Sequence, residues 1–304
     1  MRRSFFIVGP TATGKSELAA DVAHEVGAEI VSADAFQIYR GLDLLTAKPD
    51  DSTRAKAPHH LIGTTPLRDE MNAEKYRRAA SRAIDEINSR CKLAIVVGGS
   101  GLYIRVLTHG LAPLPQSDPR LREKLNAMSL DDLCSQLVEV DPETARKIDL
   151  KNRRRVIRAL EICSLTRKPV STQSLCAGAS HSEAPTGVFV FRDRQELYER
   201  INQRVEMMFE RGVIEEVRTA GTTSATASQM IGLREIRELL VGEKSLSHCI
   251  AEIQQATRHY AKRQLTWFRR QTNFPMLNLS FLTRNEAVKW ISLRILSEAG
   301  TRDD

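Results

Sequence analysis

A glycine-rich segment near the N-terminus has the residue types and spacing of a phosphate-binding loop. It reads Gly-Pro-Thr-Ala-Thr-Gly-Lys-Ser and follows the apolar run Ser4–Val8. In such a loop, glycines let backbone N–H groups turn toward an anion, a lysine reaches a terminal phosphate, and a serine hydroxyl is a candidate Mg²⁺ ligand. The residues expected to bind phosphate are Gly9, Pro10, Thr11, Ala12, Thr13, Gly14, Lys15 and Ser16.

Two further polar segments follow apolar runs. Asp34 comes after Glu29–Ser32 and could accept a proton or help to hold Mg²⁺, although an aspartate there is also typical of a turn or helix cap. The segment Gly-Gly-Ser-Gly at 98–101 follows the run 93–97 and lacks the second magnesium carboxylate of ATP-hydrolysing enzymes. Its glycines permit close approach of a large substrate and Ser100 offers a hydroxyl, while a plain glycine turn fits equally well.

The elements that must position these segments follow from the alternation of apolar runs with helical patterns at 16–26 and 73–90. This rhythm is typical of an α/β fold, and with the phosphate loop it predicts a P-loop NTPase-like parallel sheet core covered by helices. Ligands bind at the carboxyl ends of the strands in such sheets. The three polar segments are therefore expected to meet at one site.

The pattern changes in the middle of the chain, where helical segments follow one another without a strand until about residue 186. We predict an α-helical insertion domain at 113–185, within a catalytic core made of residues 1–112 and 186–304. The end of the insertion, 174–185, is rich in Ser, Ala and Gly and indicates a mobile connection. The predicted helices of the insertion lie at 119–128, 130–140, 142–148 and 153–166.

Composition limits the classes of function. The 304 residues carry a formal charge of +7 and a sequence pI near 9.3, which favours a polyanionic partner but is equally typical of a basic soluble protein. Five scattered cysteines argue against a disulfide framework and a zinc site. The absence of a membrane-spanning apolar run and of a signal peptide predicts a cytoplasmic protein.

Two arginine-rich helical segments, at 152–160 and 258–270, mix cationic with apolar residues at helical spacing. This pattern suits a face for backbone phosphates opposite a core face, and a solvated basic face fits as well. Trp267 and Phe268 are expected in the core rather than as platforms for base stacking.

Taken together, these motifs resemble those of the tRNA dimethylallyltransferases, also called tRNA isopentenyltransferases. They follow the order of that family over nearly the whole chain, and the glycine-rich segment at 98–103 and the run at 261–269 are close to diagnostic together. The matching segments lie at residues 9–16, 34–39, 46–49, 58–62, 98–103, 153–161, 231–235 and 261–269.

The resemblance implies that a dimethylallyl group passes from dimethylallyl diphosphate to N6 of the adenosine 3′ of the anticodon, with Mg²⁺ present and pyrophosphate released. Asp34 would accept the amine proton, Thr11 and Lys15 would bind the diphosphate, and Ser16 would help to place the metal. Ser100 and Arg122 would contact the substrates near the reacting centre, where Arg122 suits the neutralisation of pyrophosphate.

The resemblance also implies a tRNA interface that includes the insertion, with the anticodon stem-loop as partner. Separately, we expect no membrane partner and a monomer. The implied tRNA contacts are Asp34, Ala35, Phe36, Gln37, Arg154, Arg155, Val156, Ile157, Arg158, Met230, Ile231, Gly232, Leu233, Arg234 and Glu235.

Some positions depart from the family pattern. Ala35 and Leu233 each lack a hydroxyl that is common in the family, which puts individual RNA contacts in doubt, whereas Ser100 replaces a threonine and keeps its hydroxyl. A cysteine- and histidine-rich zinc finger of the eukaryotic kind is not present, which favours a bacterial-type enzyme. Two alternatives stay open at this point: a small-molecule P-loop kinase, and a non-catalytic RNA-binding protein with a relic phosphate loop.

Overall fold

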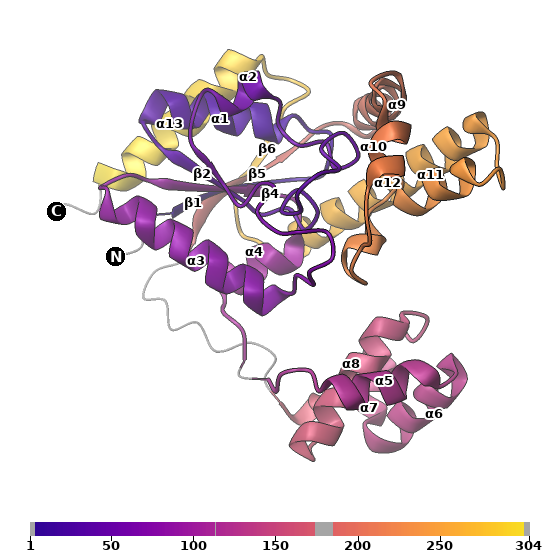
Figure 1. Ribbon diagram of the computed structural model, residues 1–304. Helices are drawn as coiled ribbons and strands as arrows, with labels where there is room; N and C mark the ends of the chain where they lie inside the picture. Colours follow the sequence, from indigo (N-terminus) through magenta and orange to yellow (C-terminus); the bar gives the residue numbers. More distant parts are fainter. Residues whose placement is uncertain (1–3, 113, 174–184, 301–304) are drawn as a thin grey trace. The chain divides into compact units, whose positions relative to one another are not determined.

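The chain forms two compact units (Figure 1). The computed structural model describes residues 4–112, 114–173 and 185–300. One unit consists of Met1–Leu107 with Glu183–Asp304, and the other of Thr108–Ser182. These divisions lie within a few residues of the boundaries expected at 113 and 185. Of the connection predicted at 174–185, all but the last residue lies outside the described part of the chain.

The larger unit contains a sheet of six parallel strands in the order β3-β2-β4-β1-β5-β6. The central strands are apolar and buried on both faces, as a parallel sheet covered by helices requires. The predicted α/β class is therefore confirmed. The strands are β1 (Ser4–Val8), β2 (Glu29–Ser32), β3 (His59–His60), β4 (Ala94–Gly98), β5 (Thr186–Phe191) and β6 (Met276–Asn278).

Helices cover both faces of this sheet (Figure 1). On one face, α1 and α13 pack against each other, and their apolar residues share a core with β1, β4 and β5. On the other face lie α3 and α4, and the long helix α12 packs against α9 beside the sheet. The helices of this unit are α1 (Lys15–Val26), α2 (Asp51–Arg54), α3 (Ala73–Ser89), α4 (Gly101–Thr108), α9 (Arg194–Glu210), α10 (Val213–Thr219), α11 (Leu233–Leu240), α12 (Leu246–Gln271) and α13 (Arg284–Gly300).

The smaller unit is helical, as the sequence predicts. Each of its α-helices begins after a residue whose side chain accepts a hydrogen bond from the first turn, and these caps are Asp118, Ser129, Asp141 and Asn152. Leucines of α6 and the apolar face of α8 meet in a separate core. The helices are α5 (Pro119–Ala127), α6 (Leu130–Val140), α7 (Pro142–Lys147) and α8 (Arg153–Thr166). None of the helices in the described residues combines the length and apolarity needed to cross a membrane.

A buried carboxylate joins the edge of the sheet to the end of α3. Glu29 on β2 is 3% exposed, and its oxygens lie 2.7 Å from Arg90 Nη2, 2.8 Å from His60 Nε2 and 3.3 Å from Lys92 Nζ. Burial opposes ionisation of this carboxylate, but the three hydrogen bonds outweigh it and lower the pKa of Glu29 to about 2. The charged form of Glu29 therefore stabilises the fold.

Replacing Glu29 with glutamine is expected to lower the free energy of unfolding near neutral pH by roughly 3 kcal/mol, because three cationic or polar partners lose their carboxylate. The pKa of Glu29 is lowered on folding, so its contribution is present above about pH 4.5 and is lost as the pH falls toward 2. Urea unfolding at several pH values should show the difference between parent and variant shrinking in acid. Glu25→Gln, an exposed change on α1, is the control; a difference that does not vary with pH would contradict this account.

Candidate active site

The phosphate loop joins β1 to α1 in a tightly turned conformation. Gly14 (φ 85°) and Ala12 (φ 64°) both adopt left-handed backbone angles, and Gly14 precedes the first residue of α1. Within the loop, Thr13 Oγ1 and Lys15 Nζ both donate to the carbonyl oxygen of Pro10, at 3.0 and 3.2 Å. The positive end of the α1 dipole therefore adjoins a preformed loop, as anion binding at a helix N-terminus requires.

Three arginines at or near α9 hold this loop from outside, and the sequence analysis missed them. Arg192 and Arg200 donate from Nε to loop carbonyl oxygens, and Arg204 donates from Nη1 to the Thr11 hydroxyl, each at 2.9 Å. The i, i+4 spacing of Arg200 and Arg204 is the one signal that could have indicated a shared face. The guanidinium groups give the loop a positive surrounding well suited to a diphosphate.

A buried glutamine on α12 links the phosphate loop to the second glycine-rich segment. Gln264 is 5% exposed; its Oε1 accepts from the Thr11 N–H at 2.9 Å, and its Nε2 donates to the Gly99 carbonyl oxygen at 2.8 Å. A Cβ atom on residue 99 would lie 2.2 Å from that Nε2. Glycine at this position therefore makes room for the bridge, which the sequence pattern did not indicate.

The Asp34 segment lies directly against the end of β4. The Ser100 Oγ accepts from the N–H of Ala35 at 2.9 Å, and a Cβ on Gly98 would lie 2.2 Å from the Ala33 carbonyl oxygen. Asp34 Oδ1 accepts backbone N–H groups from residues 36 and 37 at 2.9 and 3.2 Å. The three polar segments therefore meet as expected, with Ser100 anchoring the chain beside Asp34.

The charges of the loop and of Asp34 act on one another. Burial has the largest effect on the pKa of Lys15 and, together with the Arg204 guanidinium, lowers it to about 8. The carboxylates of Asp34 and Glu17 have the opposite, smaller effect and raise this pKa. Burial likewise lowers the pKa of Arg204, against the same two carboxylates. A cationic phosphate site and a candidate proton acceptor thus lie within electrostatic reach of each other.

Three buried tyrosines, Tyr76, Tyr103 and Tyr260, lie within electrostatic reach of Asp34. The rings of Tyr76 and Tyr103 stack with centroids 3.8 Å apart, and the Tyr76 hydroxyl donates to the Ser32 carbonyl oxygen at 3.1 Å. Burial raises the pKa of Tyr76, Tyr103 and Tyr260, and the Asp34 carboxylate raises each further. These phenols therefore stay neutral and give Asp34 an aromatic environment.

The predicted Mg²⁺ would have few protein ligands. Among the described residues, no group of three or more His, Cys, Asp or Glu side chains could hold a metal ion. Mg²⁺ commonly binds through one or two protein oxygens together with phosphates and water. Ser16 in the first turn of α1 and Asp34 are the oxygen donors that fit such a shared site.

Arg122 belongs to the smaller unit, where it already has a carboxylate partner. Its Nε and Nη2 donate to the two oxygens of Glu161 at 2.7 and 2.6 Å, and Glu161 is 0% exposed. Arg158 Nη1 and the Ser117 hydroxyl donate to the same carboxylate at 3.3 and 2.7 Å. The role of Arg122 at the diphosphate stays a prediction, and in this structure Arg122 helps to hold α5 against α8.

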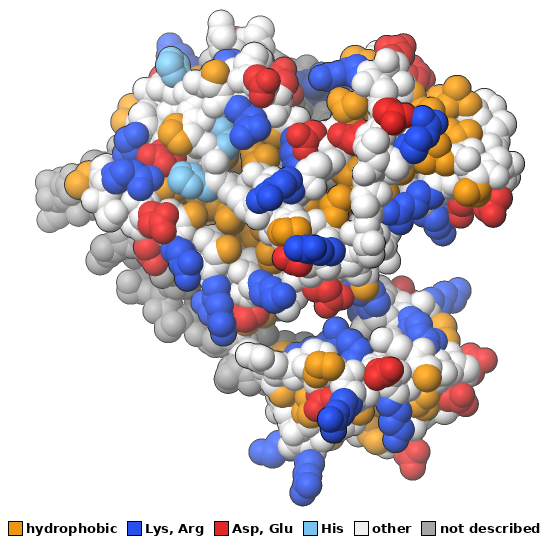
Figure 2. Space-filling view, viewed as in Figure 1, with side chains coloured by type: hydrophobic (Ala, Val, Ile, Leu, Met, Phe, Trp, Pro, Cys, Tyr) orange, Lys and Arg blue, Asp and Glu red, His pale blue; other side chains and the backbone are white. Residues whose placement is uncertain are grey.

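Several residues expected to contact tRNA have buried side chains. Those of Val156 and Ile157 lie in the core of the smaller unit, and those of Met230, Leu233 and Glu235 are at most 8% exposed in the larger one. In this conformation the side chains of these five residues are not available to RNA, and contacts through their backbone stay predictions. Figure 2 shows Lys and Arg side chains spread over both units and interspersed with acidic ones. The other implied contact residues with side chains are at least partly exposed, and their RNA contacts stay predictions. They are Asp34, Ala35, Phe36, Gln37, Arg154, Arg155, Arg158, Ile231 and Arg234.

Comparisons with known proteins match most of the chain. A family model described as IPP transferase matches residues 37–271. A tRNA dimethylallyltransferase of Akkermansia muciniphila is 40% identical over 98% of this chain and 99% of its own length, and tRNA dimethylallyltransferase 1 of Citrifermentans bemidjiense is 44% identical over 87% and 88%. The crystal structure of a tRNA isopentenylpyrophosphate transferase from Bacillus halodurans superposes with a TM-score of 0.71 at 30% identity, covering all of both chains.

The lowered pKa of Lys15 predicts that inorganic pyrophosphate binds with uptake of a proton in alkaline solution. A bound anion raises the pKa again, so affinity should fall by about tenfold between roughly pH 7 and pH 9 as free Lys15 loses its proton. Titration calorimetry in buffers of different ionisation enthalpy measures this uptake. The Lys15→Arg variant keeps its side chain protonated throughout this range, so it should lose the share of proton uptake that is due to Lys15. If the affinity of this variant depends on pH as that of the parent does, the pH dependence comes from the titration of pyrophosphate itself.

Proposed function

The chain belongs to the IPP transferase family, and from this membership we propose that it transfers a dimethylallyl group from dimethylallyl diphosphate to N6 of the adenosine 3′ of the tRNA anticodon. The reaction class follows from relatives that are tRNA dimethylallyltransferases by name. A small-molecule kinase and a non-catalytic RNA-binding protein are the alternatives that this membership displaces.

The observation that carries the proposed assignment of roles is the placement of Asp34 beside a cationic phosphate loop. Asp34 has electrostatic interactions with both Lys15 and Arg204, and Arg204 donates to Thr11 within the loop. A prenyl diphosphate whose phosphates lie in the loop would direct its allylic carbon toward the Asp34 side. The amine of an adenine extruded from its stack would approach that carbon from the Asp34 segment.

The proposed step is a displacement at the allylic carbon. The bond from this carbon to the diphosphate oxygen breaks, and its electron pair leaves with pyrophosphate. A bond forms between N6 and the same carbon, and the N6 proton passes to the Asp34 carboxylate. Lys15 and Arg204 would stabilise the charge that develops on the leaving group.

Mg²⁺ would be held by the diphosphate oxygens together with the Ser16 hydroxyl. When bound, it would add positive charge next to the leaving oxygens. The protein residues would bind the phosphates and orient Asp34, and the stacked rings of Tyr76 and Tyr103 lie within its electrostatic reach. Ser100 fixes the backbone on which Asp34 stands, through the N–H of Ala35.

Replacing Asp34 with asparagine is expected to lower prenyl transfer by roughly two to four orders of magnitude while tRNA affinity changes little, because the amide cannot accept the proton. The purified protein is incubated with Mg²⁺, dimethylallyl diphosphate and unmodified tRNA with adenosine 3′ of the anticodon, and the product nucleoside is quantified by mass spectrometry. Asp50→Asn is the matched control, since asparagine caps a helix as well as aspartate and Asp50 caps α2.

Normal turnover by the Asp34 variant would remove Asp34 from the mechanism. If the parent protein instead formed no prenylated nucleoside but transferred phosphate from ATP to an acceptor, the proposed reaction would be wrong.

Replacing Arg154 with alanine is expected to weaken tRNA binding and to lower the slope of log affinity against log salt by about one, the value for one lost phosphate contact. Arg154 is exposed in the first turn of α8. Binding is measured by fluorescence anisotropy at several salt concentrations. Lys124→Ala, which removes one exposed charge from α5 of the same unit, controls for net charge; equal slopes for the two variants would contradict a specific contact.

A further inference from the structure

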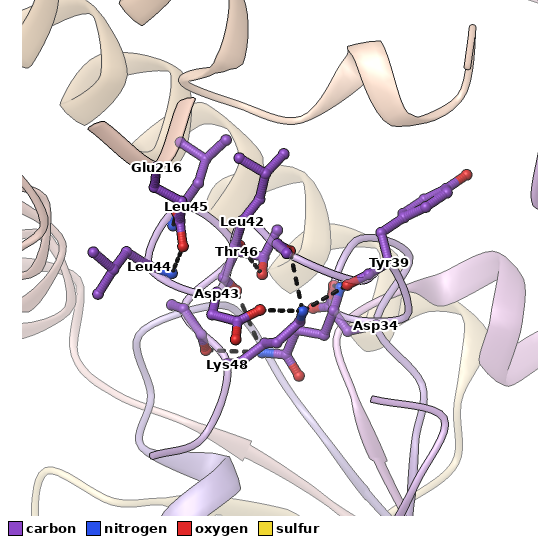
Figure 3. A network of polar contacts seen from close by, with 12 residues as sticks. Asp34, Tyr39, Leu42, Asp43, Leu44, Leu45, Thr46, Lys48 and Glu216 are labelled. Atoms are coloured by element: carbon purple, nitrogen blue, oxygen red, sulfur yellow. Dashed lines mark hydrogen bonds and ion pairs between the residues drawn. The ribbon is translucent and has the colours of Figure 1, made fainter. Parts of the chain in front are cut away.

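A single helical turn at residues 42–47 lies between Asp34 and Glu216 (Figure 3). The N–H of Thr46 donates to the Leu42 carbonyl oxygen and that of Ala47 to the Leu44 carbonyl oxygen, each at 3.0 Å. Leu42 (φ 56°) and Ala47 (φ 49°) both adopt left-handed angles, which are uncommon for residues with a Cβ. A turn with this backbone needs support from outside itself, and we call it the 42–47 turn.

Glu216 on α10 supports the N-terminal end of the 42–47 turn. Its two carboxylate oxygens accept the backbone N–H groups of Leu44 and Leu45, each at 2.9 Å (Figure 3). A carboxylate that accepts two N–H groups at the start of a turn acts as a helix cap does, and its charge strengthens both bonds. In this case the cap comes from a helix about 170 residues later in the sequence.

Gln37 supports the C-terminal end and leads back to Asp34. Its Nε2 donates to the carbonyl oxygens of Ala47 at 2.9 Å and Thr46 at 3.4 Å, while its backbone N–H donates to Asp34 Oδ1 at 3.2 Å. Both backbone bonds to Asp34 end on Oδ1, which orients the other oxygen of the carboxylate. Gln37 thus connects the 42–47 turn directly to the candidate base.

Lys48 fixes the path of the chain between these two ends. Its side chain is 6% exposed, and its Nζ lies 2.5 Å from the Tyr39 carbonyl oxygen, 3.1 Å from the Gly41 carbonyl oxygen and 2.5 Å from Asp43 Oδ1. Its ammonium therefore satisfies acceptors on both sides of the left-handed residue Leu42. The segment from Asp34 to Lys48 is held as one connected unit, of which Glu216 is the external anchor.

We propose that Glu216 is a positioning residue for prenyl transfer. By capping the 42–47 turn it fixes Gln37, and through Gln37 it orients the Asp34 carboxylate toward the substrate amine. The inference rests on the proposed function of Asp34 as the proton acceptor. A misplacement of about 1 Å in a reacting group can lower the rate a hundredfold, so loss of the Glu216 carboxylate should lower the rate of prenyl transfer.

The test is a double-mutant cycle between Glu216 and Asp34. Glu216→Ala and the isosteric Glu216→Gln are each combined with Asp34→Asn, and single-turnover prenyl transfer and tRNA dissociation constants are measured for all variants. Glu215→Gln is the matched control, because Glu215 is the neighbouring glutamate of α10 and pairs at the surface with Arg218.

With Asp34 present, Glu216→Ala is expected to lower the transfer rate by about ten- to a hundredfold, with the tRNA dissociation constant within about twofold of the parent value. Glu216→Gln should show a smaller loss, since its amide oxygen can still accept one N–H. In the Asp34→Asn background, the Glu216 changes should cost little more, because the group they position is already gone.

Full additivity of the two losses would overturn the inference, as would a Glu216→Gln rate equal to that of the parent. A lower affinity for tRNA at unchanged rate would also overturn it, by assigning Glu216 to RNA binding. If Glu216→Ala does not fold, Glu216→Gln carries the cycle. Product formation by the parent protein tests the proposed reaction separately. If the parent forms no prenylated product, both the proposed reaction and the inference about Glu216 are wrong.

Discussion

The carbonyl oxygen of Ala33 occupies the space that a Cβ atom on residue 98 would need, with only 2.2 Å between the two positions. The same holds for Gly9 and the Val190 carbonyl oxygen, also at 2.2 Å. At the carboxyl edge of the sheet, backbone therefore packs directly on backbone. The phosphate loop approaches β5 this closely, and the end of β4 approaches the Asp34 segment this closely, because Gly9 and Gly98 have no side chain. These two glycines of the site are therefore required by the backbone contacts.

Charge is distributed around this convergence in a definite order. Cationic groups, Lys15 with Arg204 and its neighbours, lie on the side of the phosphate loop, and the Asp34 carboxylate lies on the other. Burial lowers the pKa of Lys15 and of Arg204, and a bound anion would raise both pKa values again. Neutral tyrosines next to Asp34 add no competing charge. The arrangement suits a reaction in which a diphosphate departs and a neutral amine arrives.

Sequence reasoning was most successful where function depends on consecutive residues. The phosphate loop, the strands before each polar segment and the helices of the insertion could be predicted, since glycine spacing and apolar periodicity are local signals. It failed where a side chain forms hydrogen bonds with a segment distant in the sequence. Gln264 bonds to Thr11 and Glu216 bonds to Leu44, and no local sequence pattern near Gln264 or Glu216 indicates these partners. The family resemblance assigned the whole segment 154–158 to RNA, including Val156 and Ile157, although their apolar side chains form the core face of α8. The short edge strands β3 and β6 carry no periodic pattern to recognise.

The bond between Thr11 and Gln264 spans 253 residues of the chain. A ribosome that adds roughly 5 to 20 residues per second needs tens of seconds to reach Gln264 after it has made Thr11. During synthesis the phosphate loop emerges early, whereas α9 with its arginines and α12 with its glutamine are made much later. The nascent protein therefore stays without a finished phosphate site until most of the chain is made. A shortened translation product that ends before α12 would keep the loop motif and the arginines of α9 but would lack the hydrogen bond from Thr11 to Gln264.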